Sequence, residues 1–373
     1  MVHPFPVRHI GLIGGGQLAR MMIYRTTKLG FHFTVLDPDP DCGAAPVADV
    51  MHQGSLYDRE ALARLVKGCE VTTYDIEHCD TVVLAELEDQ GHQIFPSPRL
   101  LQTVQNKVLQ KQLYLSHGLP VAPFLNTDFA DLTPSDFPVV QKLVTGGYDG
   151  RGVAILHGPS DQGLEGNTYL EALVPLEKEL GVMVARSRNG ESVVYPVVEM
   201  LFHPQLHVCT EVLAPANLTP ALETRARELA VAVVGALEGV GVFGVELFLT
   251  AGGELVVNEV APRPHNSGHY TMEACKVCQF ENHLRAVAGL PLGLPEFFSP
   301  AAMVNLLGQG TGATALEGLD GALAEPGFSL HLYGKRQCRP GRKMGHFTIT
   351  AATTQLALES ARRVNETFGV TGA

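Results

Sequence analysis

Three features are missing from this chain. It has no excess of basic residues, since 27 lysines and arginines stand against 39 acids and give a net charge of −12. A protein that binds nucleic acid usually carries a basic patch or stripe, so we expect no nucleic-acid partner. The most apolar region, 229–249, is interrupted by glutamates and glycines, which predicts no membrane segment. The N-terminus lacks a charged start followed by an apolar core, so we expect no signal peptide.

Cysteine is present without a disulfide pattern. The seven cysteines are an odd number and show no framework spacing, which favours free thiols and a cytoplasmic protein. Cys275 and Cys278 form a lone Cys-x-x-Cys motif, which we interpret as structural. The composition, 45% hydrophobic and 18% charged, is that of a globular protein. A chain of 373 residues is too long for one ordinary core, and we expect two or three domains.

The N-terminal segment reads as a strand, a glycine turn (Gly14-Gly15-Gly16) and a helix that begins near Ala19. The next strand ends in Asp37, so the segment fits a Gly-x-Gly-x-x-Ala dinucleotide-binding pattern with an acid beyond it. Taken alone, the pattern favours a nicotinamide-dependent dehydrogenase. Its specificity is low, because any strand-turn-helix unit needs a tight first turn and glycine supplies it.

Strands and helices continue to alternate as far as the segment 96–98, which predicts a small parallel, doubly wound domain. Ligands bind at the carboxyl ends of the strands in such sheets. Asp75 and Glu77 lie at the end of the strand predicted at 71–76 and are therefore candidate ligand contacts. Glu77 could instead be a helix N-terminal carboxylate that the helix dipole favours.

The region 99–118 has the apolar stripe of one helix, with Lys107 and Lys111 off the stripe, where both could be solvated. A strand at 138–144 carries Lys142 and runs into a segment with four glycines between 146 and 152. Such a segment suits a flap whose backbone amides approach phosphate. The alternative is a glycine-rich hairpin that binds nothing.

Two apolar strands further along each carry one acid, Glu246 and Glu259. If Gly252 and Gly253 form a two-residue hairpin loop, these carboxylates lie directly opposite each other. Like charges in opposed positions repel, so the pair needs a shared proton or a cation, and we favour a divalent metal that carries a phosphate. The alternative is a half-exposed hairpin on which both acids face solvent.

Two further clusters carry charge. The second strand opens into a loop with Arg263, His265, Asn266 and His269. After residue 298 short strands dominate, and the basic run 335–343 is the strongest concentration of positive charge in an acidic chain. It could bind a phosphate or form a solvated hairpin.

Together these motifs resemble the ATP-grasp superfamily and, within it, the family of N5-carboxyaminoimidazole ribonucleotide synthetases. The resemblance runs over nearly the whole chain. It is most specific in the segments 14–18, 145–152, 258–269, 279–286 and 339–346, whose order and spacing carry more weight than any one of them.

The resemblance implies an α/β (α+β) ATP-grasp fold with three domains. These would be a Rossmann-like N-terminal domain over 1–98, an ATP-grasp domain over 99–298 and a C-terminal β-rich domain over 299–373. The ATP-grasp domain would consist of a smaller lobe of about 99–170 and a larger lobe of about 171–298. The family suggests a homodimer.

The implied reaction belongs to de novo purine biosynthesis. ATP and bicarbonate would form carboxyphosphate, whose carboxyl group would pass to 5-aminoimidazole ribonucleotide. Glu246 and Glu259 would hold Mg²⁺, or Mn²⁺, on the ATP phosphates. The other expected nucleotide contacts are Lys107, Lys142, Gly147, Tyr148, Gly150, Gly152, Glu171, Val174, Glu179 and Asn258. Catalytic roles would fall to Arg263, His265, Asn266, Asp149 and Arg151. The ribonucleotide would contact Gln17, Glu77, Tyr148, Asp149, Arg151, Lys335, Arg342 and Lys343.

Some positions depart from the family pattern. Lys107 follows Asn106 where the family often has Asp-Arg or Asp-Lys, Asp75 replaces a frequent Glu, and Tyr270 replaces a frequent Trp. Glu77 is therefore preferred to Asp75 as the substrate contact. In a regular strand Asn258 would face away from Glu259, so either a bulge intervenes or its role is indirect. Alternatives are another ATP-grasp ligase, such as a formate-dependent glycinamide ribonucleotide transformylase, the dehydrogenase, and a non-catalytic nucleotide sensor.

Overall fold

The N-terminal part is a parallel sheet with helices packed on it. The computed structural model describes residues 8–125, 129–147, 152–205 and 208–373. Four strands pair in the order β3-β2-β1-β4, all parallel, and confirm the doubly wound start of the chain. The first elements are β1 (Arg8–Ile13), α1 (Gln17–Thr26), β2 (Phe31–Asp37), β3 (Val50–Gln53), α2 (Arg59–Gly68), β4 (Val71–Tyr74) and α3 (Thr81–Asp89). Asp58 and Asp80 cap the N-termini of α2 and α3. Their side chains accept hydrogen bonds from backbone N–H groups that lack a partner within the helix.

The single helix predicted at 99–118 is two helices. Asn106 ends α4 (Pro98–Gln105) and caps α5 (Lys107–Ser116) by accepting from the amides of Val108 and Leu109, 3.1 Å away in both cases. An asparagine that bonds the backbone of the next turn competes with helix continuation. The break places Lys107 at the start of α5, where its amide donates to the carbonyl of Val144.

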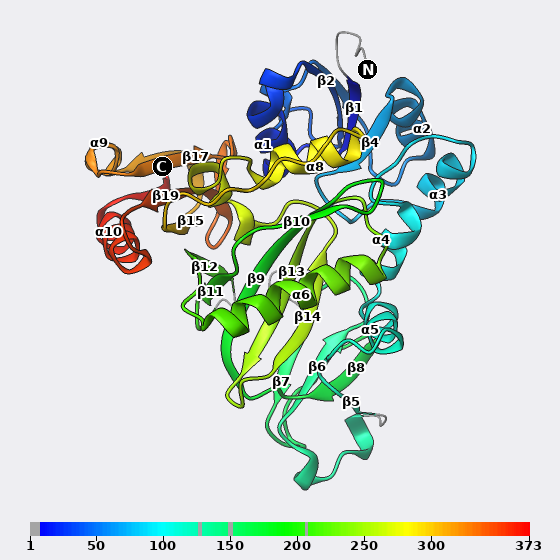
Figure 1. Ribbon diagram of the computed structural model, residues 1–373, viewed down its shortest axis with the longest axis vertical. Helices are drawn as coiled ribbons and strands as arrows, with labels where there is room; N and C mark the ends of the chain where they lie inside the picture. Colours follow the sequence, from blue (N-terminus) through cyan, green and yellow to red (C-terminus); the bar gives the residue numbers. More distant parts are fainter. Residues whose placement is uncertain (1–7, 126–128, 148–151, 206–207) are drawn as a thin grey trace.

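A small antiparallel sheet follows α5, at the bottom of Figure 1. Its strands pair in the order β5-β8-β6-β7. They are β5 (Phe124–Leu125), β6 (Val139–Leu143), β7 (Val153–Leu156) and β8 (Thr168–Ala172). Lys142 on β6 pairs with Tyr169 on β8. Residues two apart on a strand point to the same face, so Glu171 lies on the same face of this sheet as Lys142 and Tyr169.

The largest sheet spans the central and C-terminal parts without a break, because β12 pairs with β15. Its central strands are β9 (Leu176–Arg186), β10 (Ser192–Val194), β11 (Val198–Phe202), β12 (Cys209–Ala214), β13 (Gly241–Thr250) and β14 (Leu255–Ala261). The C-terminal strands are β15 (Ala301–Gln309), β16 (Gly312–Glu317), β17 (Phe328–Leu332), β18 (Gln337–Cys338), β19 (Lys343–Thr350) and β20 (Gly369–Gly372). The C-terminal region is thus β-rich, as expected, and extends the central sheet.

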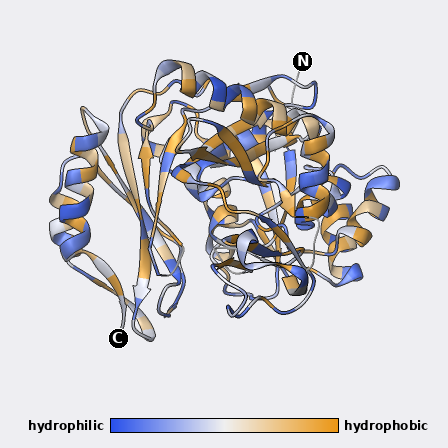
Figure 2. Ribbon diagram, turned by 90° about the horizontal axis from the view of Figure 1, so that it is seen from below, coloured by the Kyte–Doolittle hydropathy of each residue, from blue (hydrophilic) through white to orange (hydrophobic). Residues whose placement is uncertain are grey.

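Helices cover the central and C-terminal sheet. They are α6 (Pro220–Ala236), α7 (Thr271–Ala274), α8 (Gln279–Val287), α9 (Leu319–Ala324) and α10 (Thr354–Thr367). The strand pattern did not predict α10, which packs on β15 and β19 through a stripe that includes Ala357, Ala361 and Val364. Figure 2 shows apolar residues gathered on the strands and on the sides of the helices that face them. The mixed α/β fold predicted from the sequence is confirmed.

The cysteines agree with the sequence interpretation. All seven belong to the described residues and are free thiols, and both Cys275 and Cys278 are buried. Within the described ranges no helix is long and apolar enough to cross a membrane.

Candidate active site

The two hairpin carboxylates lie opposite each other, as predicted, but by a different route. Glu246 on β13 pairs in register with Glu259 on β14. The loop is residues 251–253 rather than Gly252-Gly253 alone, because Thr250 pairs with Glu254. Gly253 has φ +80°, the left-handed residue typical of a longer hairpin loop. The register then shifts by one residue at Asn258, and this bulge restores the facing of the two acids.

The bulge also answers the question about Asn258. An extra residue in one strand redirects the side chains around it, and Asn258 points toward the same site as the glutamates. Its Nδ2 donates to Glu246 Oε2 at 3.4 Å, and its Oδ1 accepts from Lys142 Nζ at 3.3 Å. Asn258 therefore links the strand carboxylates to the lysine of the smaller sheet.

The carboxylate pair is electrostatically uneven. Burial, together with Glu259 and Glu179, raises the pKa of Glu246 well above its ordinary value. Burial also works to raise the pKa of Glu259, but an ion pair with Lys107 holds it below the ordinary value. The Glu259 side chain remains 41% exposed, against 16% for Glu246. Two crowded acids, of which only Glu259 has a lysine ion pair, form a site that a further cation would stabilise.

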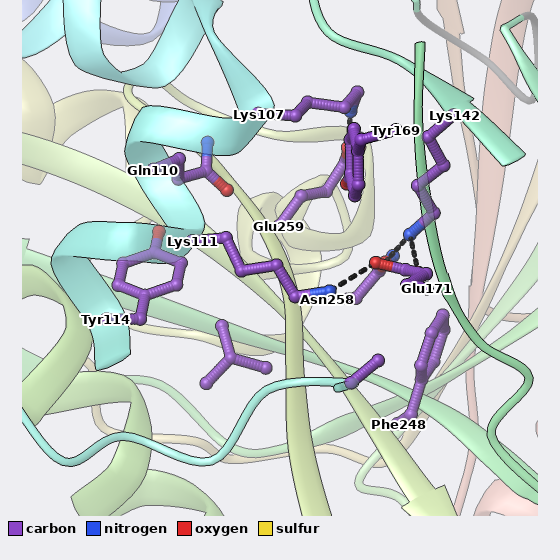
Figure 3. A pocket seen from close by; sticks show the side chains of 12 residues that line it. Lys107, Gln110, Lys111, Tyr114, Lys142, Tyr169, Glu171, Phe248, Asn258 and Glu259 are labelled. Atoms are coloured by element: carbon purple, nitrogen blue, oxygen red, sulfur yellow. Dashed lines mark hydrogen bonds and ion pairs between the residues drawn. The ribbon is translucent and has the colours of Figure 1, made fainter. Parts of the chain in front are cut away.

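The lysines of the smaller sheet meet at Glu171. Lys111 from α5 and Lys142 from β6 approach its carboxylate from different sides, and Lys142 Nζ lies 2.6 Å from Oε1 (Figure 3). The interpretation of Lys111 as solvated is wrong, because it is 6% exposed. Lys107 is not solvated either, since its ammonium pairs with Glu259 and its side chain is 18% exposed. Glu171, expected among the nucleotide contacts, has both oxygens occupied by lysines.

Two further expected nucleotide contacts, Val174 and Glu179, lie just before and on β9. Val174 lies between β8 and β9, in the connection between the two sheets. Glu179 on β9 has its pKa raised to about 7, first by burial and then by Glu259, while Lys142 opposes the shift. Of the glycine segment, Gly146, Gly147 and Gly152 are described, and Gly152 has φ +84°. Tyr148, Asp149, Gly150 and Arg151 lie outside the described residues.

The N-terminal glycine turn is already occupied by the chain's own acids. Asp37 accepts from the amide of Gly15 at 2.7 Å. Asp75 accepts from the amides of Gly16 at 3.0 Å and Ala19 at 2.6 Å. In a dinucleotide-binding domain the amides at this helix start receive the pyrophosphate. Here they are bound to carboxylates, which speaks against the dehydrogenase alternative and gives Asp75 a role in holding the turn.

The loop after β14 joins the N-terminal sheet to the hairpin. Arg263 forms a two-point ion pair with Glu77, with Nη2 2.9 Å from Oε1. Burial works to raise the pKa of Glu77, but the guanidinium overrides it and lowers the pKa to about 2. His265 Nε2 lies 3.4 Å from Glu246 Oε1. Asn266 exchanges two amide hydrogen bonds with Asn305, at 2.8 and 2.7 Å.

His269, from the same loop, does not face the site. It is 1% exposed and packs against Phe280 and His346 in the interior.

One cavity of about 650 Å³ connects these parts. It extends from the glycine turn, past the Glu77–Arg263 pair, to Lys107 and the two hairpin glutamates. The predicted site residues that line it are Gln17, Glu77, Lys107, Gly147, Glu246, Glu259, Arg263, His265, Asn266 and Lys343. The structure therefore brings the N-terminal, central and C-terminal motifs to one space.

Comparisons with known proteins find three family models along the chain. Residues 7–105 match the ribonucleotide synthetase preATP-grasp domain, 112–280 the ATP-grasp domain and 301–360 the phosphoribosylaminoimidazole carboxylase C-terminal domain. The N5-carboxyaminoimidazole ribonucleotide synthase of Synechococcus elongatus is 41% identical over 95% of this chain and 93% of its own length. That of Bacillus subtilis is 38% identical over 92% of each chain. The chain belongs to the N5-carboxyaminoimidazole ribonucleotide synthetase family.

Solved structures of this family share the fold. The synthetase of Thermotoga maritima is 47% identical, with a TM-score of 0.91 over 98% of this chain and 100% of the other. The Aspergillus clavatus synthase in complex with ADP and 5-aminoimidazole ribonucleotide is 33% identical, with a TM-score of 0.84 over 96% and 98% of the two chains. The chain is accordingly an ATP-grasp ligase of the N5-carboxyaminoimidazole ribonucleotide synthetase family that uses ATP.

The three residues of the basic cluster that were expected to contact the ribonucleotide, Lys335, Arg342 and Lys343, do not all lie along the cavity. Lys343 lines the cavity. Lys335 Nζ donates to the carbonyl of Lys343 at 2.6 Å, and Arg342 Nη1 donates to the carbonyl of Gln337 at 2.9 Å. Arg342 is exposed, and neither it nor Lys335 belongs to the described residues that line the cavity. The structure thus places Lys343, but neither of the other two basic residues, along the cavity that the rest of the synthetase site lines.

Sequence reasoning missed two residues at this synthetase-family site. Lys111 lies one helical turn beyond Lys107, and that spacing on one helix was a usable signal. Asn305 on β15 holds Asn266, but nothing in an apolar strand of the C-terminal region indicates that contact. In the described part of the chain no group of three or more His, Cys, Asp or Glu side chains is arranged to hold a metal ion.

Proposed function

We propose that this protein carboxylates 5-aminoimidazole ribonucleotide with bicarbonate at the expense of ATP. The products are N5-carboxyaminoimidazole ribonucleotide, ADP and phosphate, a step of purine biosynthesis. The observation that carries the proposal is the cavity of about 650 Å³ that joins Lys107, Glu246 and Glu259 to Glu77 and Arg263. A ligase that couples nucleotide cleavage to a second substrate needs both binding regions open to one space.

The nucleotide end is the hairpin and the lysine cluster. Lys107, Lys142 and Asn258 contact the phosphates, and Glu171, Val174 and Glu179 bind the adenosine part at the connection between the sheets. Glu246 and Glu259 hold Mg²⁺, or Mn²⁺ in its place. Their donor set fits, because these cations prefer carboxylate oxygens and complete their coordination with water and substrate phosphates. The cation neutralises charge on the phosphates during transfer. The described glycines 147 and 152, together with Tyr148 and Gly150, complete the proposed phosphate contacts.

Arg263, His265 and Asn266 line the middle of the cavity, where bicarbonate binds and carboxyphosphate forms. Arg263 supplies positive charge while Glu77 fixes its orientation through two contacts. The reciprocal amide pair with Asn305 holds Asn266 in place, so we assign it a role in shaping this region. Asp149 and Arg151 belong to the proposed catalytic set.

The ribonucleotide binds at the N-terminal end. Gln17, Glu77 and Lys343 line the cavity there, and Lys335 and Arg342 add positive charge for the phosphate. Tyr148, Asp149 and Arg151, which lie outside the described residues, belong to the proposed ribonucleotide contacts. The proposed division leaves the two substrates with different cations, which a kinetic experiment can separate.

The chemistry proceeds in two balanced steps. A bicarbonate oxygen attacks the γ-phosphorus of ATP, the bond to ADP breaks, and carboxyphosphate forms. The exocyclic amine of the ribonucleotide then attacks the carboxyl carbon, phosphate leaves with the bonding electrons, and the amine loses a proton. Carboxyphosphate is short-lived in water, so the cavity must exclude solvent while both steps occur.

The proposal includes a homodimer located in the cytoplasm, as the family resemblance suggests. Sedimentation equilibrium would report the mass in solution. A single species at the monomer mass of 40.1 kDa would contradict the dimer.

The direct test is ADP release measured with bicarbonate and 5-aminoimidazole ribonucleotide, added singly and together with MgATP. We expect release at full rate only with both co-substrates. Formate with glycinamide ribonucleotide is the matched alternative, and faster release with that pair would replace the proposal with the transformylase. An NADH titration followed by fluorescence tests the dehydrogenase, for which we expect no binding.

A further inference from the structure

Lys111 is enclosed and is not among the described residues that line the large cavity. It lies on α5 with 6% of its surface exposed. Its ammonium pairs with Glu171 and lies 4.6 Å from the centre of the Phe124 ring and 5.6 Å from that of Tyr169. It lines a cavity of only about 10 Å³ beside Lys142 and Asn258 (Figure 3). A lysine held by a carboxylate and two rings is not itself placed to contact a phosphate.

Glu171 is shared between two lysines whose situations differ. Lys111 occupies Oε2, and Lys142 occupies Oε1 at 2.6 Å. The Glu171 side chain is 5% exposed, and a carboxylate buried to this degree needs a cation beside it. Lys142 also reaches Asn258 at 3.3 Å and through it the hairpin glutamates. Lys142 is thus the lysine that connects Glu171 to the proposed phosphate site.

We propose that Lys111 is a positioning residue that neutralises Glu171, so that the charge of Lys142 is available to the nucleotide phosphates. The proposal rests on the proposed nucleotide site. With Lys111 present, the group of Lys111, Glu171 and Lys142 carries one net positive charge. Without it the group is neutral, and moving Lys142 toward a phosphate leaves a buried carboxylate unpaired.

The test is the affinity for ADP, measured by titration calorimetry in magnesium buffer. Lys111→Met should raise the Kd for ADP about tenfold or more, because the pairing of Glu171 then competes with the phosphates for Lys142. Turnover at saturating ATP should change far less than the KM for ATP. Lys111→Gln is the second variant, since its amide still donates to Glu171 without supplying charge, and we expect a similar rise.

A second substitution separates positioning from a structural role. Glu171→Gln removes the buried charge that needs a partner, so adding Lys111→Met to Glu171→Gln should change the Kd for ADP by no more than about threefold relative to Glu171→Gln alone. Lys111→Arg, which keeps the charge, should also bind more tightly than Lys111→Met. Unchanged ADP affinity in Lys111→Met and Lys111→Gln would overturn the proposal. So would a further large loss of ADP affinity when Lys111→Met is added to Glu171→Gln.

Lys178→Met is the matched control. Lys178 pairs with Glu199 at 2.6 Å on the other face of β9 from Glu179, and the two side chains are 22% and 17% exposed. Loss of the Lys178 ammonium should lower thermal stability and leave the Kd for ADP unchanged. If Lys178→Met raised the Kd for ADP as much as Lys111→Met, that result would also count against a specific role of Lys111. ADP binding can be measured whether or not the parent protein carboxylates the ribonucleotide. If the protein shows no ribonucleotide-dependent turnover, the proposed reaction is rejected. The ratios of the Kd values for ADP decide the role of Lys111 independently of that result.

Discussion

The N-terminal glycine turn and the β13–β14 hairpin each bring together a pair of acids carried on or just after apolar strands, yet the two pairs differ in their partners. Asp37 and Asp75 accept hydrogen bonds from fixed backbone amides. Glu246 and Glu259 face each other and share their neighbourhood with Lys107. The first pair has its hydrogen-bonding capacity used by the chain itself. The second pair is crowded, so that the pKa of Glu246 is raised, and it lines an open cavity.

The difference shows what separates a structural acid from a ligand-binding one. The backbone amides of the turn are already held in place by the fold. They donate to Asp75, which stabilises the turn, so these N–H groups are not available to a phosphate. Opposed carboxylates repel at close range and are relieved by a proton or a cation. Pairs of acids from apolar strands therefore serve different ends in the two regions, and variants of each pair should fail in different ways.

The largest effect is expected for Glu259→Gln. The amide removes one of the two proposed metal ligands, so turnover should fall by about a thousandfold or more. The Kd for ADP should rise much more in magnesium buffer than in EDTA, as measured by titration calorimetry. Equal weakening in both buffers would show that Glu259 contributes without a metal ion.

Asp75→Asn should act on stability instead. Gly16 and Ala19 donate to different oxygens of Asp75, so in asparagine one of these backbone donors would face the NH₂ group instead of an acceptor. We expect the free energy of unfolding to fall by about 2 kcal/mol in urea titrations. The Kd for ADP should remain that of the parent protein. A large loss of ADP affinity with unchanged stability would show that the glycine turn belongs to the nucleotide site.

The smallest effect is expected at the basic cluster. Arg342→Ala and Lys343→Ala should each raise the KM for 5-aminoimidazole ribonucleotide by about tenfold, because each removes a cation proposed to serve its phosphate. The KM for ATP should barely move in either variant at saturating bicarbonate. If the ATP constant rises and the ribonucleotide constant does not, the cluster serves the nucleotide and the proposed division of the cavity is wrong.

Local patterns were sufficient for most of the fold. The glycine turn, the alternation of strands and helices up to residue 98 and the acidic hairpin all depend on neighbours in the chain, and the structure contains each of them. The break at Asn106 was missed because a capping asparagine within an apolar stripe looks like one solvated residue of a longer helix. The continuity of β12 with β15 was missed because residues so far apart in sequence pair only when the sheet assembles.

The sequence by itself determined which chemical groups are available: two acids in facing strands, lysines on a helix and a strand, and a basic C-terminal run. Only the tertiary structure decided their partners. The loop at 251–253 and the bulge at Asn258 compensate for each other, so the predicted facing of Glu246 and Glu259 holds although the predicted turn does not. Lys111 became a buried counter-charge because β8 carries Glu171 against α5. Burial and ion pairing depend on which surfaces pack together in three dimensions, and a local sequence pattern does not specify that packing.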